Sequence, residues 1–177
     1  ACNKVCIADA EAASLAANKI LQTNRRHVLA LMGNPEMSIT RKRKNAFINL
    51  LQSRNPAVVT EIAYVHSVTA AREKTIESLL KQDGRPDTIF CMSDEILAGA
   101  MKAIQQLQLR IPDDIAVIAI SNDGFIPKLF VPEITYVETS GYQLGKLAFK
   151  RMNELLEGKS FIRELTLPSR LVMGNSI

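Results

Sequence analysis

Residues 85–101 carry the clearest structural signal in the chain and read Arg85-Pro86-Asp87-Thr88-Ile89-Phe90-Cys91-Met92-Ser93-Asp94-Glu95-Ile96-Leu97-Ala98-Gly99-Ala100-Met101. The run Thr88–Met92 has the pattern of a strand buried on both faces of a sheet. Ser93 follows it as a candidate N-cap, and Asp94 and Glu95 lie where the helix dipole favours negative charge. These residues therefore predict a buried strand that leads directly into a helix ending near Gln106.

The same alternation of strand and helix extends to both sides of this stretch. The expected strands are Val5–Ala8, Val28–Met32, Val58–Tyr64 and Ile115–Ile120, and the expected helices are Glu11–Gln22, Ser38–Gln52 and Ala70–Lys81. Such strand–helix units predict a doubly wound α/β fold, with a mostly parallel sheet and helices on both faces. After Pro132 we expect a short strand at Ile134–Val137, a helix at Gly141–Leu156 and a final extended segment at Leu165–Met173.

Polar and turn-forming residues stand at the expected carboxyl ends of four strands. They are Gly33-Asn34, Val65-His66, Ser93-Asp94 and Ser121-Asn122-Asp123. Open parallel sheets bind their ligands at this edge. The sequence therefore predicts a binding site there.

The composition indicates a soluble protein with a substantial core, because 47% of the 177 residues are hydrophobic. Apolar runs such as Ile115–Ile120 are far shorter than the ~18–20 residues of a membrane span, and no leader pattern opens the chain, so we expect a cytoplasmic protein without a membrane partner. The net charge of +4 is compatible with nucleic acid. However, the basic clusters Arg25-Arg26 and Arg41-Lys42-Arg43-Lys44 lie at expected helix ends and faces without interleaved aromatics, which favours a solvated surface.

No motif of an enzyme or of a metal site is present in the sequence. The two histidines, His27 and His66, have no cysteine or aspartate at the spacing of a nucleophile–base pair. Gly33-Asn34-Pro35 matches neither a dinucleotide-binding nor a Walker motif. The three cysteines match no metal-ligand spacing: Cys2, Cys6 and Cys91. We therefore expect no catalysis, no metal and no cofactor.

Several segments resemble those of LacI/GalR transcriptional repressors. Residues 85–101 are similar to the family's P-D-A-I-F-x-x-(N/S)-D-x-x-A-x-G-A, and residues 109–118 to its x-R-I-P-x-D-I-x-V-I-G. Further likenesses are residues 24–28 to G-H-R-x-I, residues 43–47 to R-x-x-G-F, and residues 132–145 to P-x-L-T-T-V…G…A. Together they span nearly the whole chain in the family's order.

The resemblance implies a type I periplasmic-binding-protein-like fold, in which two lobes are joined by three crossovers and hold a ligand between them. It places residues 26–121 and 163–177 in the C-terminal lobe, and residues 1–25 and 135–157 in the N-terminal lobe. It also implies that the helix-turn-helix headpiece, the hinge helix and the first half of the N-terminal lobe are absent.

The resemblance further implies five effector-binding residues. Arg43 matches the arginine of R-x-x-G-F, whose donor fork holds vicinal hydroxyls or a carboxylate, although a surface charge in a basic run is the alternative. Ser93 matches a pocket Asn or Ser, with a plain N-cap as the alternative. His66 lies near the family's stacking aromatic, with a surface loop as the alternative. Ser121 and Asn122 stand in the segment where the family has G-(Y/F)-D-(D/N).

The chain departs from the family pattern at four positions. Ser121 replaces the usual pocket aspartate and Ala119 the glycine before it. Losing a carboxylate opposite Arg43 makes an anionic effector, such as a sugar acid or sugar phosphate, more plausible than a plain neutral sugar. Ala46 replaces the glycine of R-x-x-G-F, and Gly174 stands where the family has an arginine.

These inferences predict the ligand-sensing core of a LacI-type transcriptional regulator. A small effector would shift homodimers between DNA-competent and DNA-incompetent states, and operator DNA would be bound only through the missing headpiece. The alternative is an exported solute receptor of a transport system. The helix Glu95–Gln106, with Ile96, Ala100 and Ala103, is a candidate dimer interface, unless these residues face only their own sheet.

Overall fold

The computed structural model describes residues 3–158 and 164–177. Its helices are α1 (Asp9–Leu21), α2 (Ser38–Arg54), α3 (Val68–Leu79), α4 (Asp94–Gln106), α5 (Phe125–Lys128) and α6 (Gly141–Leu156). Its strands are β1 (Lys4–Ile7), β2 (His27–Met32), β3 (Val59–Tyr64), β4 (Thr88–Cys91), β5 (Ala116–Ser121), β6 (Thr135–Glu138), β7 (Glu164–Leu167) and β8 (Arg170–Val172). The strands and helices expected from the sequence are present, with ends that differ by a few residues at most, but the single extended segment expected at Leu165–Met173 is divided into β7 and β8.

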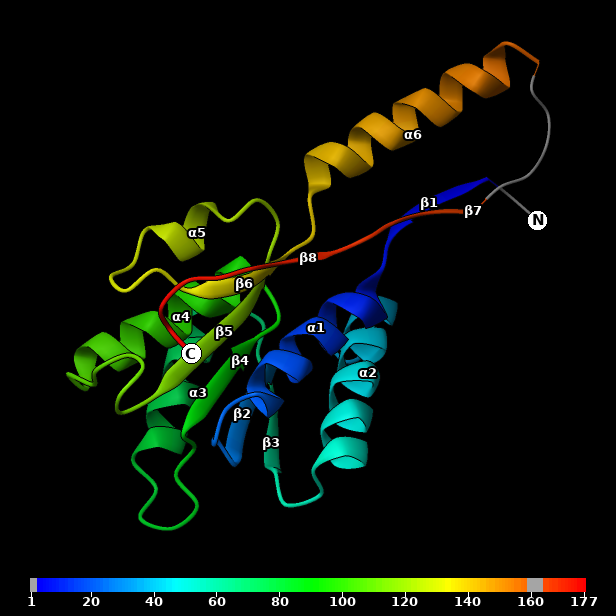
Figure 1. Cartoon of the computed structure of the whole chain (residues 1–177). Coiled ribbons are helices and arrows are strands. Elements are labelled where there is room, and N and C mark those ends of the chain that lie inside the picture. The colour runs from blue at the N-terminus through cyan, green and yellow to red at the C-terminus, as the bar shows by residue number, and fades with distance from the viewer. Residues whose placement is uncertain (1–2, 159–163) are drawn as a thin grey trace.

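A six-stranded sheet forms the centre of the molecule (Figure 1). Its order is β3-β2-β4-β5-β6-β8, and every neighbouring pair is parallel except β6 and β8. Helices α1 and α2 pack together on one face, and α3 and α4 pack together on the other. The predicted doubly wound, mostly parallel α/β fold is confirmed.

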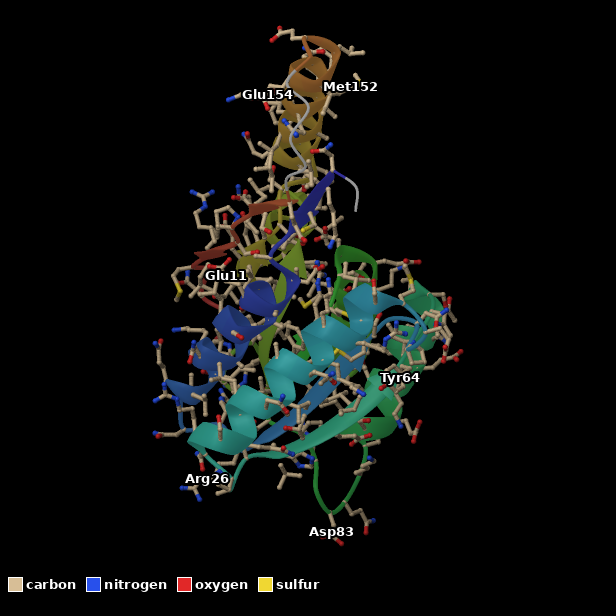
Figure 2. All side chains as sticks on the ribbon, turned by 90° about the vertical axis from the view of Figure 1, so that its right-hand side faces the viewer. Glu11, Arg26, Tyr64, Asp83, Met152 and Glu154 are labelled. Atoms are coloured by element: carbon tan, nitrogen blue, oxygen red, sulfur yellow. The ribbon has the colours of Figure 1, made fainter. Side chains whose placement is uncertain are left out.

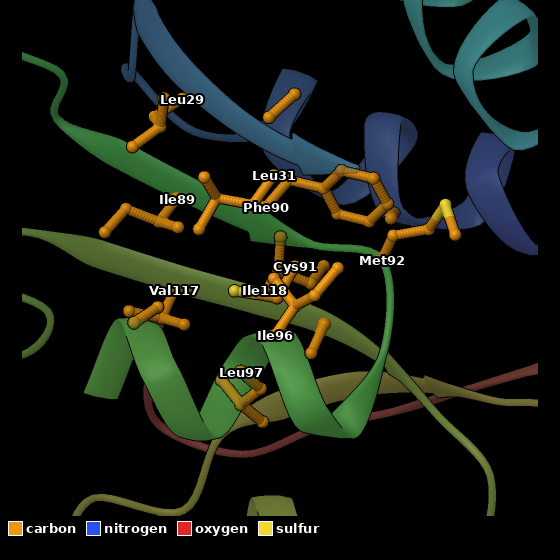
Figure 3. Packing of buried hydrophobic residues seen from close by; sticks show 14 of the residues in the cluster. Leu29, Leu31, Ile89, Phe90, Cys91, Met92, Ile96, Leu97, Val117 and Ile118 are labelled. Atoms are coloured by element: carbon orange, nitrogen blue, oxygen red, sulfur yellow. The ribbon is translucent and has the colours of Figure 1, made fainter. Parts of the chain in front are cut away.

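The core lies between the sheet and these two helix layers. Phe47 of α2 stacks on Phe90 of β4 with ring centroids 4.2 Å apart. On the opposite face, Ile96 of α4 is directed at β4 and β5 (Figure 3). Gly99 lets α4 approach α3, because a Cβ atom at this position would lie 2.3 Å from the carbonyl oxygen of Val68. Both faces of the sheet are therefore filled by side chains of this chain.

Three elements stand apart from this layered structure. Strands β1 and β7 pair in parallel as a separate two-stranded sheet, and α6 contacts β1. Figure 2 places Met152 and Glu154 of α6 at one end of the molecule, and Arg26 and Asp83 at the other end. We call β1, β7 and α6 the arm, and the remaining elements the body.

The structure divides the chain differently from the predicted lobe boundaries. Helix α1, expected in the N-terminal lobe, packs against α2, β5 and β6, and strand β6 is a member of the six-stranded sheet. Strand β7, expected in the C-terminal lobe, pairs with β1. These elements were misplaced because pairing partners distant in sequence decide which sheet a strand joins.

One element was not expected from the sequence. Helix α5 has only four residues and contains Pro127. It begins after Gly124, whose φ of 76° is a left-handed conformation that favours glycine. A single helical turn is too short to show a helical period in the sequence.

Candidate ligand-binding site

A cavity of about 360 Å³ lies at the carboxyl ends of β2, β3 and β4. Its polar lining comes from Asn34, His66, Ser93 and Glu95. This is the edge of the sheet where the sequence predicted a binding site. Of the five predicted site residues, His66 and Ser93 line this cavity, whereas Arg43, Ser121 and Asn122 do not.

Ser93 forms the N-cap of α4. Its backbone is extended, and its hydroxyl oxygen accepts a hydrogen bond from the backbone N–H of Ile96 at 3.4 Å. The predicted cap is confirmed. Because the hydroxyl proton can still be donated, the cap is compatible with a hydrogen bond to a molecule in the cavity.

Arg43 is buried between two other elements and is only 5% exposed. Its Nε and Nη2 atoms lie 3.0 and 2.9 Å from Oδ1 of Asp9, and its Nη1 donates to the carbonyl oxygen of Met92 at 3.0 Å. Burial lowers the pKa of Arg43, and the charge of Asp9 opposes that shift. The alternative of a solvated surface charge is wrong, and direct contact between Arg43 and an effector stays a prediction.

Asp9 is the partner of Arg43 that was not expected from the sequence. It begins α1 two residues after β1 ends, and its partner Arg43 lies 34 positions further along the chain. The available signal was the position of Asp9, since acidic residues favour the first turn of a helix and this turn follows a strand end. Asp9 thus supplies a carboxylate beside Arg43, although Ser121 replaces the aspartate of the family pattern.

Ser121 and Asn122 hold the turn that follows β5. Ser121 is 1% exposed, and its hydroxyl oxygen accepts from the backbone N–H of Gly124 at 3.0 Å. The backbone N–H of Asn122 donates to Oδ2 of Asp94 at 3.0 Å. The side-chain Oδ1 of Asn122 accepts from the N–H of Gly141 at 2.7 Å. Both residues therefore make structural hydrogen bonds within the chain, and their predicted contact with an effector stays a prediction.

Two buried oxygen atoms near the cavity lack a hydrogen-bond partner among the described residues. One is Oδ1 of Asp94, between the lining residues Ser93 and Glu95. The other is Oγ1 of Thr40, which lies 3.5 Å from where a Cβ atom on the lining residue Gly33 would be. Buried polar atoms are rarely unsatisfied in proteins, so such atoms call for a polar partner.

Comparison with known proteins identifies the family. Residues 20–177 match the model of the periplasmic binding protein-like domain. The chain is 33% identical over 96 residues to a lactose operon repressor of Rhizobium radiobacter and covers 84% of that protein. It is 29% identical over 165 residues to the ribose operon repressor of Haemophilus influenzae.

The chain belongs to the periplasmic binding protein-like domain family, as found in LacI-type regulators. It spans about half of the Haemophilus influenzae repressor, 49% of its length. Among solved structures, a dimeric Lac repressor with a C-terminal deletion superimposes on 99% of the chain with a TM-score of 0.88 at 20% identity, and the match covers 64% of that structure. A LacI family regulator from Arthrobacter, in complex with lactose, superimposes on 99% of the chain with a TM-score of 0.84 at 22% identity, over 67% of its own length. These likenesses show the fold.

One departure from the family pattern has a steric explanation. A Cβ atom on Gly174 would lie 2.3 Å from the carbonyl oxygen of Glu133, so the backbone leaves no space for the family's arginine at this position. The following residue, Asn175, donates its N–H to the same carbonyl at 2.9 Å. Nothing in the structure explains Ala46, where the family has glycine.

Proposed function

We propose that the chain is the ligand-sensing core of a LacI-type transcriptional regulator and that its effector occupies the cavity beside His66 and Ser93. The observation that carries the proposal is the position of this cavity at the carboxyl edge of the parallel sheet. The nearby unpaired oxygens of Thr40 and Asp94 support it, because a hydroxylated effector or the water around it would satisfy them.

The charges around the cavity favour a neutral, hydroxyl-rich effector over an anionic one. The positive charge of Arg43 is matched by Asp9 at 2.9 Å. The cavity lining contains the carboxylate of Glu95 and neither lysine nor arginine. An anion would therefore meet no unmatched cation there, whereas asparagine, serine and histidine side chains hydrogen-bond sugar hydroxyls well. Of the effectors expected from the sequence, which are a sugar, a sugar acid and a sugar phosphate, we therefore propose the neutral sugar.

In this proposal operator DNA is bound through a separate headpiece, and the regulator acts in the cytoplasm as a homodimer. The names of the relatives, which are operon repressors, favour regulation over transport and over catalysis. Among the described helices, none has the length and apolar character needed to cross a bilayer. No specific observation supports the transport alternative.

The dimer interface that we propose differs from the one expected from the sequence. Ile96, Ala100 and Ala103 are buried within the body, so these side chains are not available for contact with a second copy. An apolar groove of about 460 Å³ lies nearby, between the end of α4 and the segment after α5, where Leu129 and the 99% exposed Val131 line it. A second copy of the chain is the occupant we propose, since a similar solved structure is a dimeric Lac repressor.

Calorimetric titration with lactose and D-ribose tests the effector site. We expect His66→Ala and Ser93→Ala each to weaken binding by about two- to tenfold, the effect of losing one hydrogen bond to a ligand. His27→Ala is the matched control, because His27 lies at the opposite, amino end of β2. Equal affinity in all three variants would contradict the assignment.

Sedimentation velocity tests the proposed dimer surface. A buried, unpaired charge is costly in an apolar interface, so Val131→Asp is expected to convert dimers to monomers. Val59→Asp is the control, because Val59 is also exposed, at 58%, but lies on the distant edge strand β3. Dimers that persist in Val131→Asp would rule out this surface.

A further inference from the structure

The turn between β4 and α4 touches both the cavity and the contacts that hold the arm. We use the name β4–α4 turn for Met92 and Ser93, which link the two elements, together with Asp94, the first residue of α4. Ser93 lines the cavity. Its neighbours Met92 and Asp94 accept hydrogen bonds from residues near the two places where the chain passes between the body and the arm. Two series of hydrogen bonds start from this turn, and we call each of them a bridge.

The first bridge leads to the junction of β1 and α1. The carbonyl oxygen of Met92 accepts from Nη1 of Arg43, and the other side of the same guanidinium holds Asp9. Asp9 directly follows Ala8, the residue between β1 and α1, and the N–H of Ala8 donates to Leu167 of β7 at 3.0 Å. Because a guanidinium is planar and rigid, it fixes the distance between the turn and this junction.

The second bridge leads to the first residue of α6. Oδ2 of Asp94 accepts from the backbone N–H of Asn122, and Oδ1 of Asn122 accepts from the N–H of Gly141. A Cβ atom at Gly141 would lie 2.7 Å from that Oδ1 atom, so a side chain at this position would displace the Asn122 amide from its present place. Asp94 thus orients Asn122, and Asn122 holds the start of α6.

We propose that Arg43 and Asn122 are positioning residues through which the β4–α4 turn sets the placement of the arm on the body. Their intrachain contacts connect this turn to the two junctions. A molecule bound at Ser93 would contact the same turn and could thereby act on the placement of the arm; this link to ligand binding rests on the proposed function. The positioning itself does not depend on it.

Hydrogen exchange of single backbone amides, measured by NMR without any ligand, tests the second bridge. Asp94→Ala is expected to raise the exchange rate of the Gly141 amide although Asp94 does not bond to Gly141. The expected increase is about two- to tenfold, the effect of losing the neutral hydrogen bond between Gly141 and Asn122. In the Asn122→Ala background, the same Asp94→Ala change is expected to have no further effect on Gly141. A purely local role for each residue would instead give additive effects.

Control variants keep this experiment decisive. Glu95→Ala removes the neighbouring carboxylate of the same helix turn and is expected to leave the Gly141 amide unchanged. Asn122→Asp keeps an acceptor oxygen at the same place and is expected to restore slow exchange. Protection of the β2 and β5 amides verifies that each variant is folded. An unchanged Gly141 amide in Asp94→Ala, or additive effects in the double variant, would overturn the proposal for this bridge.

The first bridge is tested in the same way. Arg43→Lys keeps the charge, but a single ammonium lacks the planar fork that reaches both Asp9 and the Met92 carbonyl. We expect faster exchange of the Ala8 amide in this variant, by about two- to tenfold. Arg41→Lys, two positions earlier in α2, is the matched control. An unchanged Ala8 amide in Arg43→Lys would exclude Arg43 as a positioning residue, and because no ligand is used, either outcome is separate from the fate of the proposed function.

Discussion

The body and the arm both contain large apolar side chains but differ in what covers them. In the body, the apolar side chains of β2, β4 and β5 are buried almost completely between two helix layers. In the arm, Tyr142 and Phe149 of α6 are 73% and 61% exposed, and Arg151 is the buried residue of that helix. Burial of apolar side chains therefore stabilises the body, whereas the position of the arm depends more on the polar contacts at its two junctions with the body.

The largest expected difference in stability between the two regions comes from replacing one phenylalanine in each of them. Phe90→Ala deletes a fully buried ring that stacks on Phe47 and should destabilise the protein by about 3–5 kcal/mol. Phe149→Ala removes an exposed ring of the arm and should change the free energy of unfolding by less than about 0.5 kcal/mol. Chemical denaturation measures both, and comparable losses would mean that α6 is packed as tightly as the sheet.

A glycine-to-alanine pair should give effects of opposite sign. Gly99→Ala places a methyl group 2.3 Å from the carbonyl oxygen of Val68 and should cost about 1–3 kcal/mol, because two helix backbones must separate. At Gly145 of α6 a Cβ atom meets no other atom within 4 Å, so Gly145→Ala should stabilise the protein by about 0.5–1 kcal/mol through helix propensity. Thermal unfolding of the two variants measures the difference. A destabilising Gly145→Ala would show that the arm helix is covered at this position.

The smallest effects concern the surface ion pairs of the two regions. In the body, hydrogen bonds from Arg110 lower the pKa of Asp114 to about 2, and in the arm a hydrogen bond from Lys4 lowers the pKa of Glu164. Since each folded-state pKa is depressed, the stabilisation is complete above the ordinary carboxyl pKa and is lost as the pH falls through the folded value. NMR titration of the carboxyl carbons should show Arg110→Gln raising the pKa of Asp114 towards its ordinary value of 3.8 and Lys4→Gln raising that of Glu164. An unmoved Asp114 in Arg110→Gln would refute the pairing.

The sequence predicted the body well because a strand buried on both faces, such as Val28–Met32, is an unbroken apolar run between helical periods. It did not predict which sheet β6 and β7 join, because hydrogen-bonding partners far apart in sequence decide that. For the site, the positions of His66 and Ser93 after the carboxyl ends of two strands were enough to predict that they lie near the same cavity. The roles of Arg43 and Asn122 depend on Asp9 and Gly141, partners 34 and 19 positions away, and no local pattern indicates such contacts.

The most direct measurement is chemical-shift mapping of the backbone amides during titration with lactose and D-ribose. We expect at least one of these sugars to shift the amides of Asn34, His66 and Ser93, and we expect smaller shifts of the Ala8 and Gly141 amides at the two junctions. Shifts confined to the groove at Leu129 and Val131, or shifts at the cavity that leave both junctions unchanged, would contradict this expectation.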